Sequence, residues 1–163
     1  MSERAYTTVD KTAWGTGPWT DEPDKIQYVD GPSGLDCLIV RNGGGALCGY
    51  VGVPAGHPWH SVDYDGLSLR NIDVHCGLTY SASCMEGAPE DRGICHVPDP
   101  GRPGDVWWFG FDCAHAYDLS PGHAAGLREQ LPGYGGIYDV YRDLGYVRNE
   151  VRNLARQLAE VTA

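Results

Sequence analysis

Short apolar runs separated by glycine-rich turns make up the middle of this chain. Residues 35–42 (LDCLIVRN) and 46–53 (ALCGYVGV) are two such runs, and the sequence NGGG joins them. Glycine accepts the positive φ angles of tight turns at little cost, so this pattern predicts a β-hairpin. We take residues 35–42 as the first clear strand of the chain.

Two later segments, residues 74–81 (VHCGLTYS) and 105–113 (DVWWFGFDC), also predict strands. Successive side chains of a strand point to opposite faces of a sheet. In the first segment, one face carries Val74, Cys76, Leu78 and Tyr80. In the second segment, one face carries Trp107, Phe109, Phe111 and Cys113, and the other carries Val106, Trp108, Gly110 and Asp112.

The pattern changes to a helical period near the C-terminus. Apolar residues recur at alternating spacings of four and three, which predicts one amphipathic helix over residues 139–160. Asp139 and Asp143 fall in its first turns, where carboxylates suit the helix dipole. Packing against a core is the expected use of this stripe, and a dimer seam is the alternative. The stripe consists of Val140, Leu144, Val147, Val151, Leu154 and Leu158.

These elements predict an α+β fold: a single domain over residues 1–163, with an antiparallel sheet, long loops and one C-terminal amphipathic helix packed on the sheet. Residues 1–34 are expected to be loop-rich, residues 35–113 to form the sheet and its loops, and residues 139–160 to form the helix. Residues 82–104 have no strand or helix pattern. A loop of that length is usually functional or held in place by something.

Charge and composition narrow the classes of partner. The 163 residues include 12 Lys+Arg against 22 Asp+Glu, a net charge of -10, which disfavours binding to nucleic acid or to an anionic membrane. No apolar run approaches the roughly 20 residues that cross a bilayer, and the N-terminus lacks the apolar stretch of a signal peptide. We therefore expect a cytoplasmic protein whose six cysteines are thiols or metal ligands, and three disulfides only if it is secreted.

The candidate chemistry is concentrated in one window. All six histidines and four of the six cysteines lie between residues 57 and 123. Zinc binds Cys, His and carboxylate side chains, and three protein ligands plus water make a catalytic site. The strand ending at residue 113 would present Asp112 and His115 at the sheet end, and His75 could complete the group. The full set of candidate ligands is His57, His60, Asp63, Asp65, His75, Cys84, Cys95, His96, Asp112, Cys113, His115 and Asp118.

A second predicted group, Cys84, Cys95 and His96, would instead clamp the long loop. The spacing matches no standard zinc motif, so purely structural roles stay open for these residue types. Cys76 and Cys113 could be small core residues, and Asp112 and Asp118 could cap loops.

An alternative hypothesis requires no metal: the protein has a pocket that binds a nucleotide-like or other aromatic ligand. Stacking on tryptophan would supply contact area, and polar groups would fix the orientation. Trp59 lies between Pro58 and His60 in a predicted loop, so it is the best candidate for that ligand contact.

Several segments of the chain resemble a family of small bacteriophage proteins, especially those from phages of actinobacteria. They are DEPDKIQYVD, CGYVGVPAGHPWH, VHCGLTYS, GICHVP, WWFGFDCAHAYD and YRDLGYVRNEVRNLARQLAE. The resemblance spans roughly residues 14–160. It implies a phage accessory protein made in the cytoplasm of a bacterial host, and it supplies no catalytic residues. Where the family commonly reads VHGGLTYS, this chain has Cys76, so an essential Cys76 is not expected.

Three functions follow as hypotheses. The first is a metal-dependent hydrolase, with zinc as the candidate cofactor, in which His75, Asp112 and His115 act on a small nucleotide-like ligand, for example to counter a host defence. The second is a non-catalytic protein that sequesters a small ligand or inhibits a host protein, and a homo-oligomer is compatible with this role. The third is a structural or scaffold protein.

Overall fold

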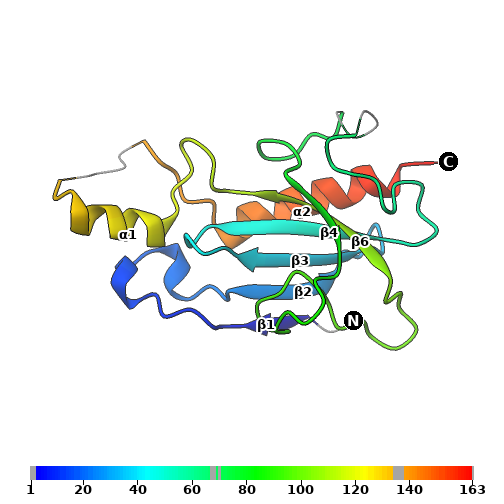
Figure 1. The fold of residues 1–163 in the computed structure, drawn as a ribbon, viewed down its shortest axis with the longest axis horizontal. Helices are drawn as coiled ribbons and strands as arrows, with labels where there is room; N and C mark the ends of the chain where they lie inside the picture. The colour runs from blue at the N-terminus through cyan, green and yellow to red at the C-terminus, as the bar shows by residue number, and fades with distance from the viewer. Residues whose placement is uncertain (1–2, 67–68, 70, 134–137, 163) are drawn as a thin grey trace.

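A computed structural model describes residues 3–66, 69, 71–133 and 138–162 and has the predicted α+β architecture (Figure 1). Six antiparallel strands form one sheet in the order β1-β2-β3-β4-β6-β5. Two α-helices accompany it, α1 (Pro121–Gln130) and α2 (Leu144–Ala159), with two short 3-10 turns, η1 (Thr12–Trp14) and η2 (Pro18–Thr20). The strands are β1 (Arg4–Tyr6), β2 (Lys25–Val29), β3 (Asp36–Arg41), β4 (Leu47–Pro54), β5 (Tyr80–Ser83) and β6 (Val106–Asp112). No helix in the described part of the chain is long and apolar enough to cross a membrane.

The predicted hairpin is present as β3 and β4, paired from Asp36↔Gly52 to Arg41↔Leu47. Its turn is closed by the side chain of Asn42, whose Oδ1 accepts hydrogen bonds from the backbone N–H groups of Gly44 and Ala46, both at 3.0 Å. Gly45 has a φ of 95°, a conformation that favours glycine.

Strand β6 lies inside the sheet, between β4 and β5, and its two faces are those predicted from alternation. Phe109, Phe111 and Cys113 join the core beneath α2, whereas Val106 and Trp108 join a second apolar cluster on the opposite face. All five of these residues are at most 1% exposed. The aromatic content of this segment therefore serves both faces of the sheet.

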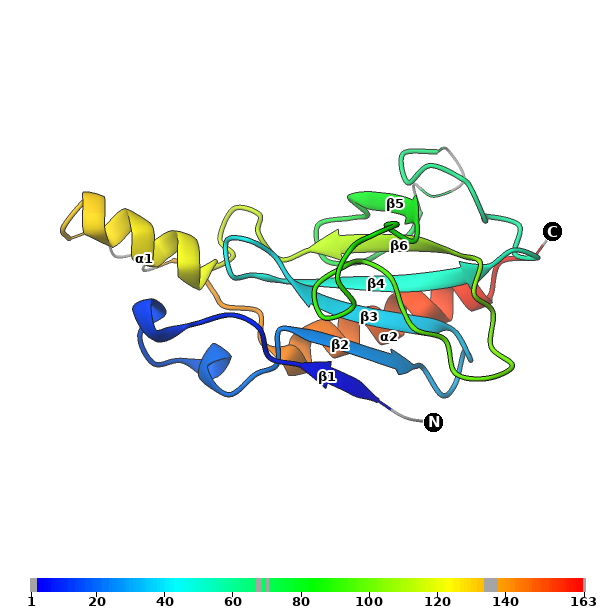
Figure 2. The same ribbon diagram turned by 60° about the horizontal axis from the view of Figure 1, so that its bottom comes forward.

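Helix α2 packs across one face of the sheet (Figures 1 and 2). Its stripe of Val147, Val151, Leu154 and Leu158 is fully buried, so the stripe forms core and not an exposed dimer seam. The close approach depends on Gly49, because a Cβ there would lie 2.6 Å from Val151 Cγ2 on the helix. The helix begins later than predicted: Asp143 caps it by accepting a hydrogen bond from Tyr146 N at 2.9 Å, and residues 139–142 precede it.

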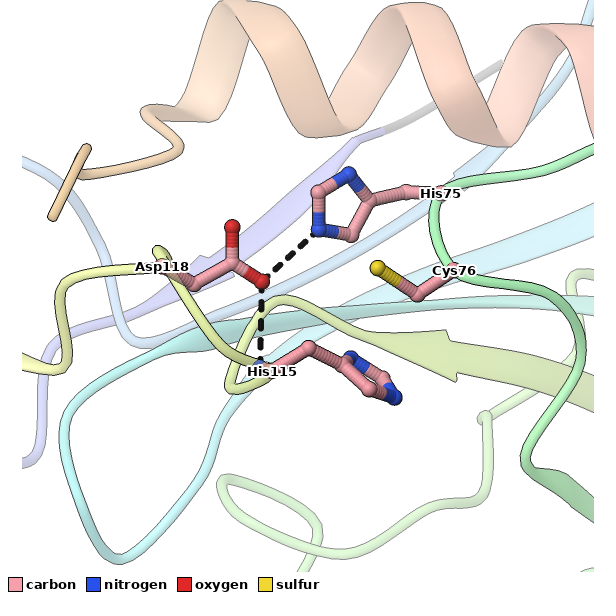
Figure 3. Close-up of side chains that lie close together, drawn as sticks. All are labelled: His75, Cys76, His115 and Asp118. Atoms are coloured by element: carbon pink, nitrogen blue, oxygen red, sulfur yellow. Dashed lines mark hydrogen bonds and ion pairs between the residues drawn. The ribbon is translucent and has the colours of Figure 1, made fainter.

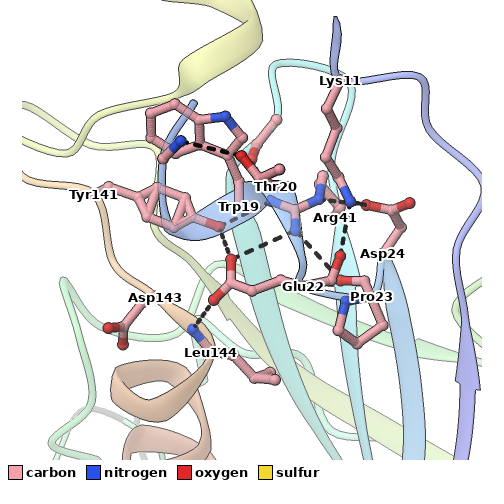
Figure 4. Close-up of polar contacts among 12 residues, drawn as sticks. Lys11, Trp19, Thr20, Glu22, Pro23, Asp24, Arg41, Tyr141, Asp143 and Leu144 are labelled. Atoms are coloured by element: carbon pink, nitrogen blue, oxygen red, sulfur yellow. Dashed lines mark hydrogen bonds and ion pairs between the residues drawn. The ribbon is translucent and has the colours of Figure 1, made fainter. Parts of the chain in front are cut away.

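The N-terminal region is more ordered than the prediction of a loop-rich segment, because residues 1–34 contain β1 and β2. A buried charge network fastens this region to the sheet (Figure 4). Asp24 Oδ1 lies 2.8 Å from Lys11 Nζ and 2.6 Å from Arg41 Nε. Burial alone would raise the pKa of Asp24, but Lys11, two backbone N–H groups and Arg41 outweigh it, and the pKa falls below its ordinary value. Asp24 is therefore held as a carboxylate.

The same network reaches the start of α2 (Figure 4). Glu22 accepts hydrogen bonds from the Tyr141 hydroxyl and, at 2.6 Å, from the backbone N–H of Leu144. The first N–H groups of a helix have no partner within it, so Glu22 supplies one from a distant part of the chain. Arg41 Nη1 donates to the Tyr141 hydroxyl at 2.9 Å and links this cap to Asp24.

Helix α1 was not predicted, since only one helix was expected. Its sequence, PGHAAGLREQ, contains two glycines and buries only Pro121 and Ala124, so it carries almost no amphipathic signal. Tertiary contacts hold it instead. The backbone N–H groups of Gly122 and His123 donate to the Gly44 carbonyl in the β3–β4 turn, at 2.9 and 3.0 Å.

The strand predicted over residues 74–81 is wrong for its first six residues. Only Tyr80 and Ser81 of that segment belong to a strand, β5. Cys76 has a φ of 54° and Gly77 a φ of 82°, and the Gly77 N–H donates to the Val74 carbonyl at 2.8 Å. Successive left-handed residues turn the chain, so the alternation expected there does not exist.

Candidate functional site

One group of polar side chains gathers at the end of β6, beside the start of α2 (Figure 3). His75 comes from the turn before β5, and His115 and Asp118 come from the segment that follows β6. The left-handed turn at Cys76 and Gly77 directs this segment back over the sheet end. The predicted convergence of His75 and His115 at this end of the sheet is present, with ring centroids 6.3 Å apart.

Asp118 links the members of this group through hydrogen bonds to its two carboxylate oxygens. Its Oδ2 lies 2.8 Å from His75 Nε2 and accepts the His115 backbone N–H at 3.1 Å, while its Oδ1 accepts from Arg142 Nε at 3.1 Å. Its side chain is 2% exposed. Burial alone would raise the pKa of Asp118, but His75, Arg142 and the His115 N–H outweigh it and lower the pKa. The other ring nitrogen of His75 lies 2.7 Å from the Tyr146 hydroxyl.

The ring of His115 carries an unsatisfied polar atom. Its Nδ1 is buried and makes no hydrogen bond, although it lies 3.1 Å from Asp112 Oδ1, a contact that is an ion pair only when the imidazole is protonated. Asp112 instead accepts the Ala114 N–H at 3.0 Å and the Thr79 hydroxyl at 3.1 Å. Buried polar atoms without a hydrogen bond are rare in folded proteins, and such an atom often belongs to a site that binds water or an ion.

Ligand atoms from His75, Cys76, His115 and Asp118 all lie within 4.8 Å of one another, so this group could hold a metal ion. Asp112, which we predicted as a member, stands beside His115 outside that set, and Asp118 provides the carboxylate. Burial, Asp118 and Asp112 raise the pKa of the Cys76 thiol, which opposes a thiolate nucleophile.

Replacing Cys76 with glycine is expected to raise the free energy of unfolding of the metal-free protein by up to about 1 kcal/mol, because glycine adopts the left-handed conformation without the Cβ conflict. Cys76 is exposed, so little packing is lost. Urea unfolding in the presence of a chelator measures the change. Ser83→Gly is the control: Ser83 is exposed in β5, where glycine should destabilise. A Cys76→Gly protein less stable than wild type would contradict the expectation.

The second predicted group is also assembled. Ligand atoms of Cys84, Cys95 and His96 lie within 4.8 Å of one another. It lies far along the sheet from the first group, since Ser83 pairs with Trp107 near the start of β6, while Asp112 is its last residue. In this structure Cys84 and Cys95 form a disulfide, which corrects the expectation that all six cysteines are thiols or ligands. The fold of the long loop brings the two sulfurs together.

Trp59 lies away from the first group. It is half-buried against the core, and the neighbouring His57 contacts the carbonyl of Leu158 at 2.7 Å, near the end of α2. The first group lies at the beginning of α2, near Tyr146. The structure therefore separates Trp59 from His75, His115 and Asp118, although His57 lies beside it.

Sequence reasoning undervalued Asp118 and missed Arg142 and Tyr146. Asp118 was among the candidate ligands but was equally consistent with a loop cap. The spacing of three residues between His115 and Asp118 was the available signal. Nothing local marked Arg142 and Tyr146, which reach the group only because α2 packs there. Comparisons with family models, with curated proteins and with solved structures find no match to this chain.

Proposed function

We propose that this chain is a metal-dependent hydrolase whose ion is held by His75, His115 and Asp118. The observation that carries the proposal is the buried Nδ1 of His115, which makes no hydrogen bond and lies beside Asp112 and near the His75–Asp118 pair. Two imidazoles and one carboxylate are a ligand set that zinc accepts, and three protein ligands leave a position for water. A bound zinc ion would lower the pKa of that water and polarise a substrate oxygen.

The surrounding side chains suit such a site. Tyr146 holds the second ring nitrogen of His75, and Arg142 holds the second oxygen of Asp118, as outer-shell partners do for metal ligands. Asp112, with its side chain 31% exposed beside His115, is placed to accept a proton from water at the open edge. Cys76 occupies a position where the resembling phage proteins commonly have glycine, so we assign it no required role.

For the substrate we favour a small, anionic, nucleotide-like molecule. Arg142 offers a positive charge at the site. Tyr117 and Tyr138, which are 70% and 77% exposed, lie on the two segments that meet at the Asp118↔Val140 bridge. Exposed aromatic rings near an arginine suit a planar base with a phosphate. The resemblance to phage proteins would place such a substrate in the cytoplasm of a bacterial host.

The test is metal content and turnover on untagged protein purified without chelator. Native mass spectrometry counts the metal, and hydrolysis of bis(p-nitrophenyl) phosphate and of a panel of nucleotides is followed before and after chelation and zinc return. We expect one zinc at this group, with turnover that chelation removes and zinc restores. His115→Ala should lose both, and His123→Ala, which changes an exposed histidine on α1, should lose neither.

Two outcomes would count against the proposal. If His115→Ala keeps its full metal content, His115 is not a ligand. If metal binds but no substrate is turned over while a small molecule is retained, the protein is a sequestering binder, the alternative function for the same group.

A further inference from the structure

The loop of residues 84–104 contains no helix or strand, yet it covers the sheet face opposite α2 (Figure 2). Cys84 and Ile94 pack against the second apolar cluster, which includes Val40 and Trp108. Buried Lys25 holds one limb of the loop: its Nζ donates to the carbonyls of Glu90, Gly93 and Cys95 at 2.5, 2.6 and 2.9 Å. The link between Cys84 and Cys95 closes the loop over that limb.

His96 completes this region with a ring oriented as a metal ligand would be. Its side chain is 1% exposed, and its Nε2 lies 3.1 Å from the carbonyl oxygen of Pro103. A carbonyl only accepts, so Nε2 carries the proton, and Nδ1 presents a lone pair towards Cys84 Sγ, 3.9 Å away. Metal-bound histidines commonly have this arrangement, with the second nitrogen donating to a carbonyl oxygen.

We infer that Cys84, Cys95 and His96 form a redox-controlled zinc site, in which a disulfide and a zinc ion are alternative closures of the same loop. This site goes beyond the proposed hydrolase and does not rest on it. Under oxidising conditions the disulfide holds the loop on the sheet. Under reducing conditions, which keep cytoplasmic thiols free, zinc takes over that task.

A dithiol reductant transfers two electrons and two protons to the Cys84–Cys95 disulfide, breaking the S–S bond, and is itself oxidised to a disulfide. Zinc then displaces the two thiol protons into solution and binds both sulfurs and His96 Nδ1, leaving water in the fourth position. Oxidation by a disulfide of the same class reverses the sequence and releases the ion.

The geometry needs only small side-chain movements. Zinc–sulfur and zinc–nitrogen bonds of about 2.3 and 2.0 Å in a tetrahedron place the ligand atoms about 3.5–3.8 Å apart. The three ligand atoms already lie within 4.8 Å. Trp108 Nε1 donates to Cys84 Sγ at 3.4 Å, a contact that favours a thiolate. A cavity of about 290 Å³, lined by Lys25, Cys84, Cys95 and His96 among others, gives ion and reductant access to the site.

The test uses the full chain carrying His115→Ala, which removes one of the proposed zinc ligands of the first group. Oxidised protein and protein reduced with dithiothreitol, then freed of reductant without air, each receive one equivalent of zinc and are weighed by native mass spectrometry. We expect one zinc on the reduced protein and none on the oxidised protein. Cys95→Ser should lower the zinc affinity of the reduced protein by more than about 100-fold. Cys48→Ala, which alters a buried cysteine of the same sheet face, should retain it.

Thermal unfolding gives a second readout: the reduced, zinc-free protein should unfold several degrees below both other forms, because its loop is open. Equal zinc binding by reduced Cys95→Ser and its parent would overturn the inference, as would a reduced protein that takes no zinc. If His115→Ala does not fold, the wild type and Cys95→Ser are compared, and the expected difference is one zinc. If this group binds no zinc, the proposal of a hydrolase at the first group is unaffected. If the first group proves not to be a hydrolase, the inference about this zinc site is likewise unaffected.

Discussion

Replacement of Arg41 by methionine is expected to lower the free energy of unfolding by about 3 kcal/mol, because buried Asp24 loses one of its two cationic partners and the groups that Arg41 contacts lose their donor. The Arg41 side chain is fully buried, 2.6 Å from Asp24. It also donates to the Gly45 carbonyl and the Tyr141 hydroxyl, each at 2.9 Å. Methionine fills much of the same volume but supplies none of these bonds. Urea unfolding at neutral pH measures the loss.

Acid unfolding provides an independent measurement of the stability that Arg41→Met loses. The pKa of Asp24 is lowered in the folded protein, so its contribution to stability is present above the ordinary aspartate value, about 3.9, and disappears as the pH falls through the folded value. Without Arg41 the folded pKa should rise, and the variant should unfold at a higher pH than the wild type. Arg156→Met is the matched control, since Arg156 is 59% exposed and forms a surface ion pair with Glu160, just after α2. A loss below about 1 kcal/mol would show that the network is not a major source of stability.

The second large effect is expected at Asp118. Asp118→Asn keeps the shape of the side chain but removes the charge that faces His75 and Arg142. If the group binds metal as proposed, zinc affinity should fall by more than about 100-fold, beyond the loss typical of an outer-shell partner. Hydrolysis should fall with it. Competition with a zinc-chelating dye measures the affinity, and circular dichroism establishes that the variant is folded.

Further variants distinguish the side chains that bind the zinc ion from those that only contact a zinc ligand. Tyr146→Phe removes only the hydroxyl 2.7 Å from His75 Nδ1, so it should weaken zinc binding by about 10–100-fold. Asp65→Asn changes an exposed aspartate in the loop after β4 and should have no effect. The same affinity in Asp118→Asn as in Asp65→Asn would remove Asp118 from the ligand set.

Local pattern was sufficient for the regular parts of the fold. The hairpin of β3 and β4, the two faces of β6 and the buried stripe of α2 follow from periodicity and turn chemistry, which act over a few residues. The same reasoning failed for α1, whose helix is held by contacts with the Gly44 carbonyl and not by an apolar stripe. It failed for residues 74–79 because alternation of residue types does not reveal two consecutive left-handed residues.

For the candidate sites too, the sequence predicted some features and the tertiary structure decided others. Composition and clustering identified the residue types of the candidate sites and the part of the chain that carries them. The expected position of Asp112 and His115 at the end of a strand predicted that His75 and His115 would lie in one group. The sequence could not show that Asp118 and not Asp112 would join that group, because the choice depends on how the chain turns after β6. It could not show the disulfide either, since Cys84 and Cys95 meet only when the loop folds back onto the sheet.

By itself, then, the sequence determined what repeats at short range: the strands with one buried face, the amphipathic helix, the acidic surface and the concentration of histidine and cysteine between residues 57 and 123. Tertiary structure decided which of those side chains meet. Glu22 caps a helix that begins at Leu144, and Lys25 binds carbonyls from residue 90 onward. Such contacts depend on the docking of α2 and of the loop of residues 84–104, and no local pattern encodes the relative position of two distant segments.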